Sequence, residues 1–285
     1  MKAMITGSKG QLGVALQRSA PEGATIVAAD MDVLDITDRD AVDAFVARET
    51  PQVIFNCAAY TAVDKAEADE EAARAVNATA VGYLADAVRH HGARLVQVST
   101  DFVFEGMLGI PYKPDERPAP LSVYGKTKAE GEWAAGGDAL VVRTAWVYAP
   151  TGANFVRTML RLMGERDTLS VVDDQIGTPT YAPDLAAALW TLAGQDAAGI
   201  YHYTDSGVAS WYDFAVAIHE EARAIGLLSR DVAVLPVPTT AYPTPARRPH
   251  YSVLDKSSTF AALGAPAPHW RVNLRRMLSE IKTHG

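Results

Sequence analysis

The first half of the chain alternates short apolar runs with longer amphipathic segments. The runs predicted to be strands are 3–5, 25–29, 53–55, 95–98 and 140–142. Uninterrupted apolar strands are typical of a parallel sheet that is covered on both faces. The helices predicted between them run from Leu12 to Ser19, over about 66–90 and over 124–135, with a further helix capped by Thr37. This pattern predicts an α/β fold with a doubly wound parallel sheet.

The second half of the chain has a different pattern. Its predicted helices lie near 154–165, 183–193, 210–225 and 271–282, with a short strand at 200–203. A proline-dense stretch, 236–249, precedes the last helix, and because proline fixes φ and lacks a donor we expect a loop there. Interleaved Tyr242, Arg247 and Arg248 favour an ordered binding loop over a mobile linker.

Composition and charge exclude several classes of protein. The 285 residues include 26 Lys and Arg against 34 Asp and Glu, a net charge of −8, so nucleic acid is not an expected partner. No apolar run approaches the ~20 residues of a membrane span, and the apolar segment after Met1 is too short for a signal peptide. The single cysteine, Cys57, excludes a disulfide-built scaffold. We therefore expect a cytoplasmic protein without a membrane partner.

Three glycines follow the first predicted strand directly. Gly7, Gly10 and Gly13 lie in the segment TGSKGQLG, which then opens a helix. Such glycines let the backbone approach a pyrophosphate, and the helix N-terminus supplies amide donors, although a purely structural turn is the alternative. Asp30 ends the second strand, where a carboxylate binds the adenosine ribose hydroxyls and favours NADH, unless it is simply a solvated strand end. No basic residue lies within 24–38, so NADPH would need a cation from elsewhere.

These features suggest a division of the chain into two parts. We expect a Rossmann-type dinucleotide-binding domain over 1–150, to which a segment at about 183–205 returns. The ranges 151–182 and 206–285 would then form a smaller α+β substrate-binding domain.

Tyr124 and Lys128 lie four residues apart and so on one face of a predicted helix. Thr100 follows the fourth predicted strand, at the sheet edge where α/β proteins bind ligands. The three residues suit ketone reduction, in which a hydride reaches the carbonyl carbon and a proton reaches its oxygen. A nearby ammonium lowers the pKa of a phenol, so Lys128 would tune Tyr124 as the acid while Thr100 holds the substrate oxygen.

Longer motifs carry a resemblance that spans nearly the whole chain. They are NCAAYTAVDKAEAD (56–69), VSTDFVFEG (98–106), YGKTKAEGE (124–132), RTAWVY (143–148), DDQIGTPT (173–180) and AYPTPARRPHYSVL (241–254). Together with the glycine turn, they resemble the dTDP-4-dehydrorhamnose reductase family of the extended short-chain dehydrogenase/reductase superfamily. The resemblance implies reduction of the C4 ketone of dTDP-4-dehydro-L-rhamnose, with NADPH or NADH as the cofactor.

The resemblance also implies roles for individual residues. Tyr124 would be the proton donor, and Lys128 would tune it and bind the nicotinamide ribose. Thr100 and Asp101 would contact the sugar, Trp146 would pack against its ring, and Arg248 would neutralise a substrate phosphate, with a core tryptophan and a surface arginine as the alternatives for the last two. The residues expected to line the cofactor, besides the three glycines, are Gln11, Leu12, Asp30, Asp35, Ile36, Ala59, Tyr60 and Thr61.

The sequence also departs from the family. Phe102 stands where the family usually has tyrosine, which leaves the chemistry intact. Some family dimers hold Mg²⁺ through glutamates, one of them in the first helix, but here that helix reads VALQR over 14–18 and has no carboxylate. We therefore expect no metal site, and a monomer and a homodimer both stay open. Two other functions stay open as well: a nucleotide-sugar epimerase or dehydratase, and a non-catalytic subunit like the regulatory subunit of methionine adenosyltransferase.

Overall fold

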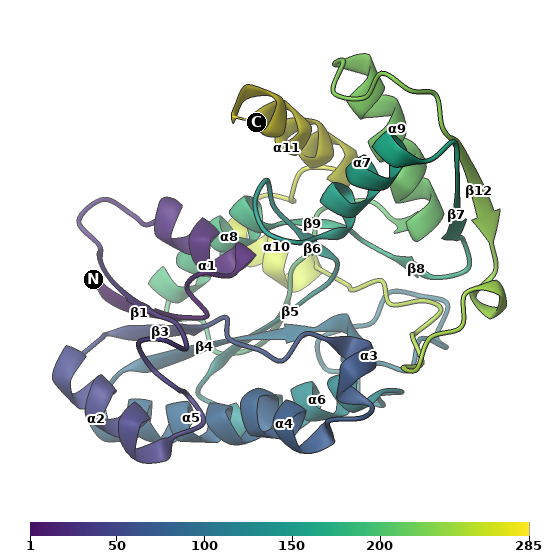
Figure 1. The fold of residues 1–285 in the computed structure, drawn as a ribbon. Coiled ribbons are helices and arrows are strands. Elements are labelled where there is room, and N and C mark those ends of the chain that lie inside the picture. The colour runs from purple at the N-terminus through teal and green to yellow at the C-terminus, as the bar shows by residue number, and fades with distance from the viewer. Residues whose placement is uncertain (285) are drawn as a thin grey trace.

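The computed structural model describes residues 1–284, and its main sheet has six parallel strands (Figure 1). In spatial order these are β10 (Gly199–His202), β5 (Leu140–Thr144), β4 (Arg94–Thr100), β3 (Val53–Asn56), β1 (Lys2–Thr6) and β2 (Thr25–Ala29). The predicted α/β fold with a parallel sheet is confirmed. β1 pairs with β2 on one side and with β3 on the other, so the strand order reverses there. Open α/β sheets bind their ligands at such a reversal.

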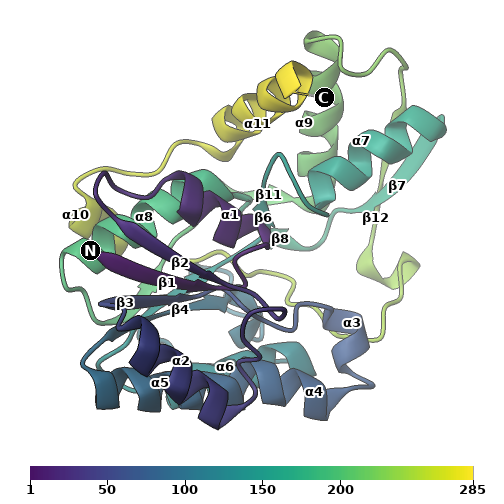
Figure 2. The ribbon, with the colours of Figure 1, turned by 60° about the vertical axis from the view of Figure 1, so that its left-hand side comes forward.

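Helices cover both faces of this sheet (Figure 2). On one face lie α2 (Arg39–Glu49), α5 (Ala80–His91) and α6 (Val123–Ala135); on the other lie α1 (Gln11–Arg18), α8 (Ala182–Gly194) and α10 (Ser257–Leu263). Successive strand residues point to opposite faces, so Ile5 and Phe55 join the core beneath α1 and α8, whereas Met4 and Ile54 join the core beneath α2 and α5. The two cores explain why the strands are apolar throughout.

A third core holds a smaller part of the molecule together. It is built around Phe214, Leu274 and Met277. Its helices are α7 (Phe155–Glu165), α9 (Trp211–Ala224) and α11 (Trp270–His284). Its strand pairs are β7 (Thr168–Val172) with β12 (Ala233–Val237), β8 (Ile176–Gly177) with β11 (Ala209–Ser210), and β6 (Val147–Tyr148) with β9 (Thr180–Tyr181). The predicted domain boundaries stay a prediction.

Two local predictions were wrong. The region 66–90 is not one helix: α3 (Val63–Ala66) and α4 (Glu70–Arg74) precede a π-helical turn, Ala75–Thr79, and then α5. The extra residue in a π turn changes which side chains face the sheet, and an alanine-rich pattern does not reveal it. The N-cap of α2 is Asp38, which accepts from the amide of Ala41 at 3.0 Å, because Thr37 donates its hydroxyl to Asp35 instead.

The remaining elements are short. A 3₁₀ turn, Asp101–Val103, follows β4, and another, Thr239–Ala241, lies in the proline-dense stretch. That stretch is an ordered loop, and Pro236 lies inside β12, which the sequence did not predict as a strand. β12 tolerates the proline because it pairs only with β7. Within residues 1–284, no helix is long and apolar enough to cross a membrane.

Candidate active site

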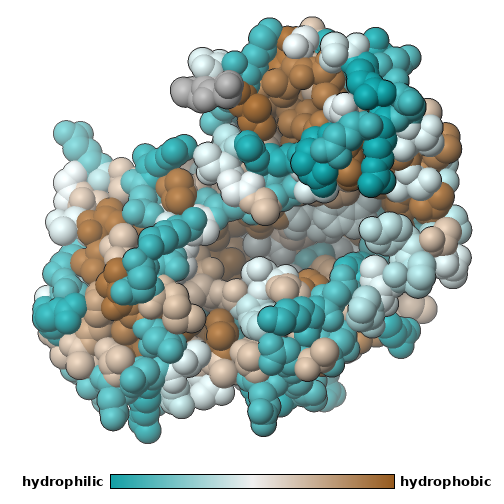
Figure 3. All heavy atoms as spheres, viewed as in Figure 1, coloured by the Kyte–Doolittle hydropathy of each residue, from teal (hydrophilic) through white to brown (hydrophobic). Residues whose placement is uncertain are grey.

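A cavity of about 880 Å³ lies at the carboxyl ends of the parallel strands. The molecule is visibly hollowed between the main sheet and the part that contains α7, α9 and α11 (Figure 3). The predicted residues that line the cavity are Gly7, Gly10, Gln11, Leu12, Gly13, Asp30, Ile36, Ala59, Tyr60, Thr61, Thr100, Tyr124, Lys128 and Trp146. Asp35, Asp101 and Arg248 do not line it. The fold therefore brings together most of the predicted cofactor and catalytic residues.

The glycine loop has no room for side chains. Gly7 has a φ of +59°, and a Cβ there would lie 2.7 Å from the backbone nitrogen of Ala58. At Gly13 a Cβ would lie 2.3 Å from the carbonyl oxygen of Gly7, so this glycine lets α1 pack against the loop. The N-cap of α1 is Gly10, which makes no side-chain cap, so the first amides of the helix are left for a ligand. This geometry fits a dinucleotide pyrophosphate.

Asp30 is already engaged by the backbone of its neighbours. Its carboxylate accepts from the amide of Lys9 at 2.8 Å and from that of Met31 at 3.0 Å. Lys9 lines the cavity and pairs through its ammonium with Asp32 at 2.7 Å. The sequence did not reveal Lys9 as the cation, because Lys9 lies outside the segment 24–38, although the glycine loop lies beside the end of β2 in space. Asp35 is bound by Thr37, which lowers the pKa of its carboxyl.

Asn77 holds the loop that contains Ala59, Tyr60 and Thr61. Its side chain accepts from the amide of Tyr60 at 2.9 Å and donates to the Tyr60 carbonyl at 3.2 Å. It also donates to the hydroxyl of Thr127 on α6 at 3.1 Å, and it is 1% exposed. Asn77 lies in the π turn and belongs to none of the predicted sites. The signal available in the sequence was a single amide side chain within an alanine-rich stretch.

Tyr124, Thr100 and Lys128 meet at the end of β4. Thr100 and Tyr124 line the cavity together, and burial raises the pKa of Tyr124 to about 12. Lys128 is 4% exposed, and its ammonium donates to the carbonyl of Val98 at 2.7 Å. Burial lowers the pKa of Lys128 to about 8, opposed by the nearby carboxylate of Glu132. The phenol is thus held protonated by burial, and the lowering of its pKa that we expected from Lys128 is absent.

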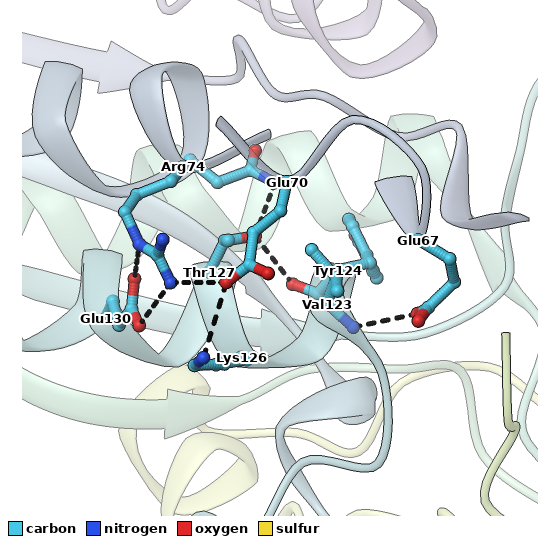
Figure 4. Close-up of polar contacts among 9 residues, drawn as sticks. Glu67, Glu70, Arg74, Val123, Tyr124, Lys126, Thr127 and Glu130 are labelled. Atoms are coloured by element: carbon cyan, nitrogen blue, oxygen red, sulfur yellow. Dashed lines mark hydrogen bonds and ion pairs between the residues drawn. The ribbon is translucent and has the colours of Figure 1, made fainter. Parts of the chain in front are cut away.

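The N-terminal half of α6, which carries Tyr124 and Lys128, is fixed by polar contacts with α3 and α4 (Figure 4). Ser122 caps the helix by accepting from the amide of Gly125 at 3.2 Å. Glu67 accepts from the otherwise free amide of Val123 at 2.9 Å. Arg74 donates to Glu70 and to Glu130, each at 2.8 Å, as Figure 4 shows. These contacts set the rotation of α6 and therefore the direction in which its catalytic face points.

Asp101 lies behind Thr100, outside the cavity lining. It is 2% exposed, accepts from Thr100 at 3.0 Å and from Ser252 at 2.5 Å, and has a pKa that burial raises to about 6. Its contact with the site therefore runs through the hydroxyl of Thr100.

Arg248 is anchored away from the cavity in this structure. Its guanidinium bonds both carboxylate oxygens of Asp64, at 2.8 and 3.1 Å, and the carbonyl of Ala246 at 3.0 Å. Asp64 also accepts from the Ala246 amide at 3.1 Å. The pair joins the proline-dense loop to α3, and it lowers the pKa of the Asp64 carboxyl.

A glycine loop at a strand reversal, with a Tyr and a Lys one helical turn apart beside a Thr, defines an oxidoreductase of the short-chain dehydrogenase/reductase type. Comparison with known proteins narrows this class. The family model for the RmlD substrate binding domain matches residues 1–283. The chain belongs to the dTDP-4-dehydrorhamnose reductase family.

Individual relatives are similar over their full length. The dTDP-4-dehydrorhamnose reductase of Escherichia coli K12 is 41% identical over 295 residues, covering 99% of each chain. The crystal structure of the Clostridium acetobutylicum reductase has a TM-score of 0.92 at 40% identity and covers 99% of this chain and 100% of that one. The Bacillus anthracis reductase, solved in complex with NADP, has a TM-score of 0.91 at 38% identity and covers 98% and 99%.

Proposed function

We propose that this protein reduces the C4 ketone of dTDP-4-dehydro-L-rhamnose to give dTDP-L-rhamnose, with NADPH or NADH as the reductant. One observation carries the proposal: Tyr124, Lys128 and Thr100 line the same cavity as the glycine loop. The full-length similarity to reductases named for this substrate supports the choice of sugar.

The proposed role of each catalytic residue follows from its surroundings. A bound dinucleotide would supply the hydride. Tyr124 would donate its proton to the carbonyl oxygen, and its raised pKa keeps that proton in place until the substrate arrives. Thr100, which lines the cavity beside the phenol, would hold the substrate oxygen. Lys128 would turn from Val98 to the nicotinamide ribose and stabilise the phenolate after proton transfer.

The substrate end of the cavity would be formed by Trp146, which would pack against the sugar ring. Asp101 would act on the sugar through Thr100, to which it is hydrogen-bonded. Arg248 would bind a substrate phosphate only after leaving Asp64, so we propose that substrate binding exchanges one anionic partner for another.

We propose that the cavity takes either dinucleotide. Asp30 stands where the ribose hydroxyls of NADH would bind, and the Bacillus anthracis relative was solved with NADP. Lys9 supplies the missing cation, because its exposed ammonium pairs with Asp32 and lies near Asp30. It would neutralise the 2′-phosphate of NADPH.

The remaining expectations concern partners and location. The nucleotide sugar is the proposed small-molecule partner, and monomer or homodimer stays open. A cytoplasmic location stays a prediction. Within residues 1–284, no cluster of three or more His, Cys, Asp or Glu side chains is arranged to hold a metal ion.

The decisive experiment follows the absorbance of NADPH or NADH after addition of enzymatically prepared dTDP-4-dehydro-L-rhamnose. Stoichiometric loss of the reduced dinucleotide and formation of dTDP-L-rhamnose are expected, with little loss on UDP-linked keto sugars. An epimerase or dehydratase would convert a nucleotide sugar without net consumption of dinucleotide, and that outcome would overturn the proposal. Absence of any turnover, together with copurification of a methionine adenosyltransferase, would favour the non-catalytic alternative.

A further inference from the structure

Trp146 has an unusual backbone at the wall of the cavity. It lines the cavity with a φ of +48°, a left-handed conformation that a bulky residue adopts only when its surroundings require it. Its carbonyl accepts from the amide of Thr180 at 3.2 Å, just before β6 pairs with β9. The main chain is thus tied down where the side chain turns toward the cavity.

One face of the Trp146 indole is covered by a second tryptophan. Trp211 stacks on it with ring centroids 3.6 Å apart and an interplanar angle of 11°. Trp211 is the first residue of α9, whose capping box with Ser210 and Asp213 fixes the start of the helix. Phe155 on α7 packs against Trp211 in turn, at 4.7 Å. Because Trp211 covers one face of Trp146, a ligand in the cavity would have to stack on the opposite face.

The edge of the same indole lies against a glycine. A Cβ on Gly177 would come within 2.8 Å of Cε2, 2.9 Å of Cζ2 and 3.0 Å of Nε1 of Trp146. Gly177 pairs with Ala209, the residue two before Trp211, so β8 and β11 bring the edge and the face contacts together. The φ of Gly177 is not positive, so its backbone conformation does not require glycine. Glycine is needed here because any side chain would collide with the indole of Trp146.

We propose that Trp211 and Gly177 are positioning residues that fix Trp146 as a rigid aromatic wall for the apolar face of a pyranose ring. The sugar's identity rests on the proposed function, whereas the wall rests on the contacts above. Aromatic rings bury apolar surface at little entropic cost when they are already held in place. Trp146 is held on one face by Trp211, along one edge by Gly177 and through its backbone by Thr180.

Two variants on different elements test the wall. Trp211→Leu removes the stacked face, and Gly177→Ala pushes the indole edge with a single methyl group. Each variant is expected to raise the KM for the nucleotide sugar roughly tenfold, which corresponds to losing the interaction free energy of an aromatic pair. The dissociation constant for NADPH should stay within about twofold, because the dinucleotide end of the cavity is untouched. Trp211→Phe keeps an aromatic face and should restore most of the affinity.

Trp133→Leu is the matched control. Trp133 is 69% exposed on α6, so its loss should change neither constant. Near-ultraviolet circular dichroism gives a readout independent of turnover: the signal of the stacked indoles should disappear in Trp211→Leu, change in Gly177→Ala and persist in Trp133→Leu.

Binding of dTDP-L-rhamnose compared with dTDP isolates the contribution of the sugar. The proposal expects Trp211→Leu and Gly177→Ala to lose the extra affinity that the sugar provides, while dTDP itself binds as before. Folded variants that have lost the stacked signal yet bind and reduce the sugar normally would overturn it. Failure of the proposed function is distinguishable, because the wild-type protein would then show the stacked signal but prefer no dTDP-sugar over dTDP.

Discussion

Burial shifts the pKa values of the two central side chains of the site, Tyr124 and Lys128, in opposite directions. The pKa of Tyr124 rises to about 12 and that of Lys128 falls to about 8. The phenol is therefore protonated at neutral pH, and its proton donation requires that the phenolate be stabilised as it forms. The Lys128 ammonium lines the same cavity, where it can stabilise the phenolate that forms when Tyr124 donates its proton.

Tyr124→Phe removes only the phenolic oxygen. Loss of a positioned general acid is expected to lower kcat by about 10²–10⁴-fold. The dissociation constant for NADPH, measured by fluorescence titration, should be unchanged because the ring remains. Turnover at the wild-type rate would exclude Tyr124 as the proton donor.

Lys128→Met should weaken dinucleotide binding and slow the reaction, yet stabilise the fold by about 1 kcal/mol, as is common when a functional site is relieved of a buried charge. The pH dependence of this stability difference follows from the lowered pKa of Lys128. Below about pH 8 the folded protein carries the full cost of the buried ammonium. From there to the ordinary value of 10.5 the folded group is neutral and that cost shrinks. Urea unfolding at several pH values should therefore show the largest difference between variant and wild type below pH 8.

Lys9→Gln tests the choice of dinucleotide. Without the ammonium, the dissociation constant for NADPH should rise about tenfold, while that for NADH changes little. Lys2→Gln, at the amino end of β1, is the control, since Lys2 pairs with Glu49 away from the cavity. Equal effects on both dinucleotides would contradict the 2′-phosphate role.

At the scale of elements, α6 depends on close contact with the π turn. A Cβ on Gly131 would lie 2.0 Å from the carbonyl oxygen of Asn77, and Asn77 holds the Tyr60 loop. Gly131→Ala is therefore expected to destabilise the protein by about 3 kcal/mol or more and to lower activity. Gly164→Ala on α7 meets nothing within 4 Å and should stabilise by up to about 1 kcal/mol. Thermal unfolding of the two variants, with opposite shifts in Tm, checks this.

Elements with a regular pattern were predictable, and contacts between distant segments were not. The apolar runs predicted five strands of the main sheet, and 200–203 predicted the sixth, because a buried parallel strand needs no partner to be recognised. The π turn at Asn77 competes with a regular helical turn, and the Asp38 cap competes with a cap by Thr37. The sequence pattern alone does not distinguish these local alternatives. Lys9 beside Asp30 and the stack of Trp146 on Trp211 join residues that only the folded sheet brings together. Tyr124, Lys128 and Thr100 were found because their spacing and strand-end position are themselves the motif.

For the whole molecule, the ion pair of Asp64 with Arg248 links the proline-dense loop to α3. We expect Arg248→Met to raise the KM for the dTDP-sugar about tenfold by removing a charge-assisted phosphate contact. It should also make the segment 239–249 more sensitive to a protease, because the loop loses its anchor. The neighbouring Arg247→Met, at an exposed position, should do neither. Limited proteolysis and steady-state kinetics on the two variants separate the effects.

The position of β10 also affects how the chain folds during synthesis. β5 ends at Thr144, but its partner β10 begins only at Gly199, after α7, α8 and the four strands β6 to β9 have been made. Until then the edge of β5, which is fully buried in the finished protein, is unpaired. An uncovered apolar edge recruits other chains. A ribosome that stalls between β5 and β10 would expose a nascent chain prone to aggregation. We therefore expect the nascent chain to need chaperones until β10 has been synthesised.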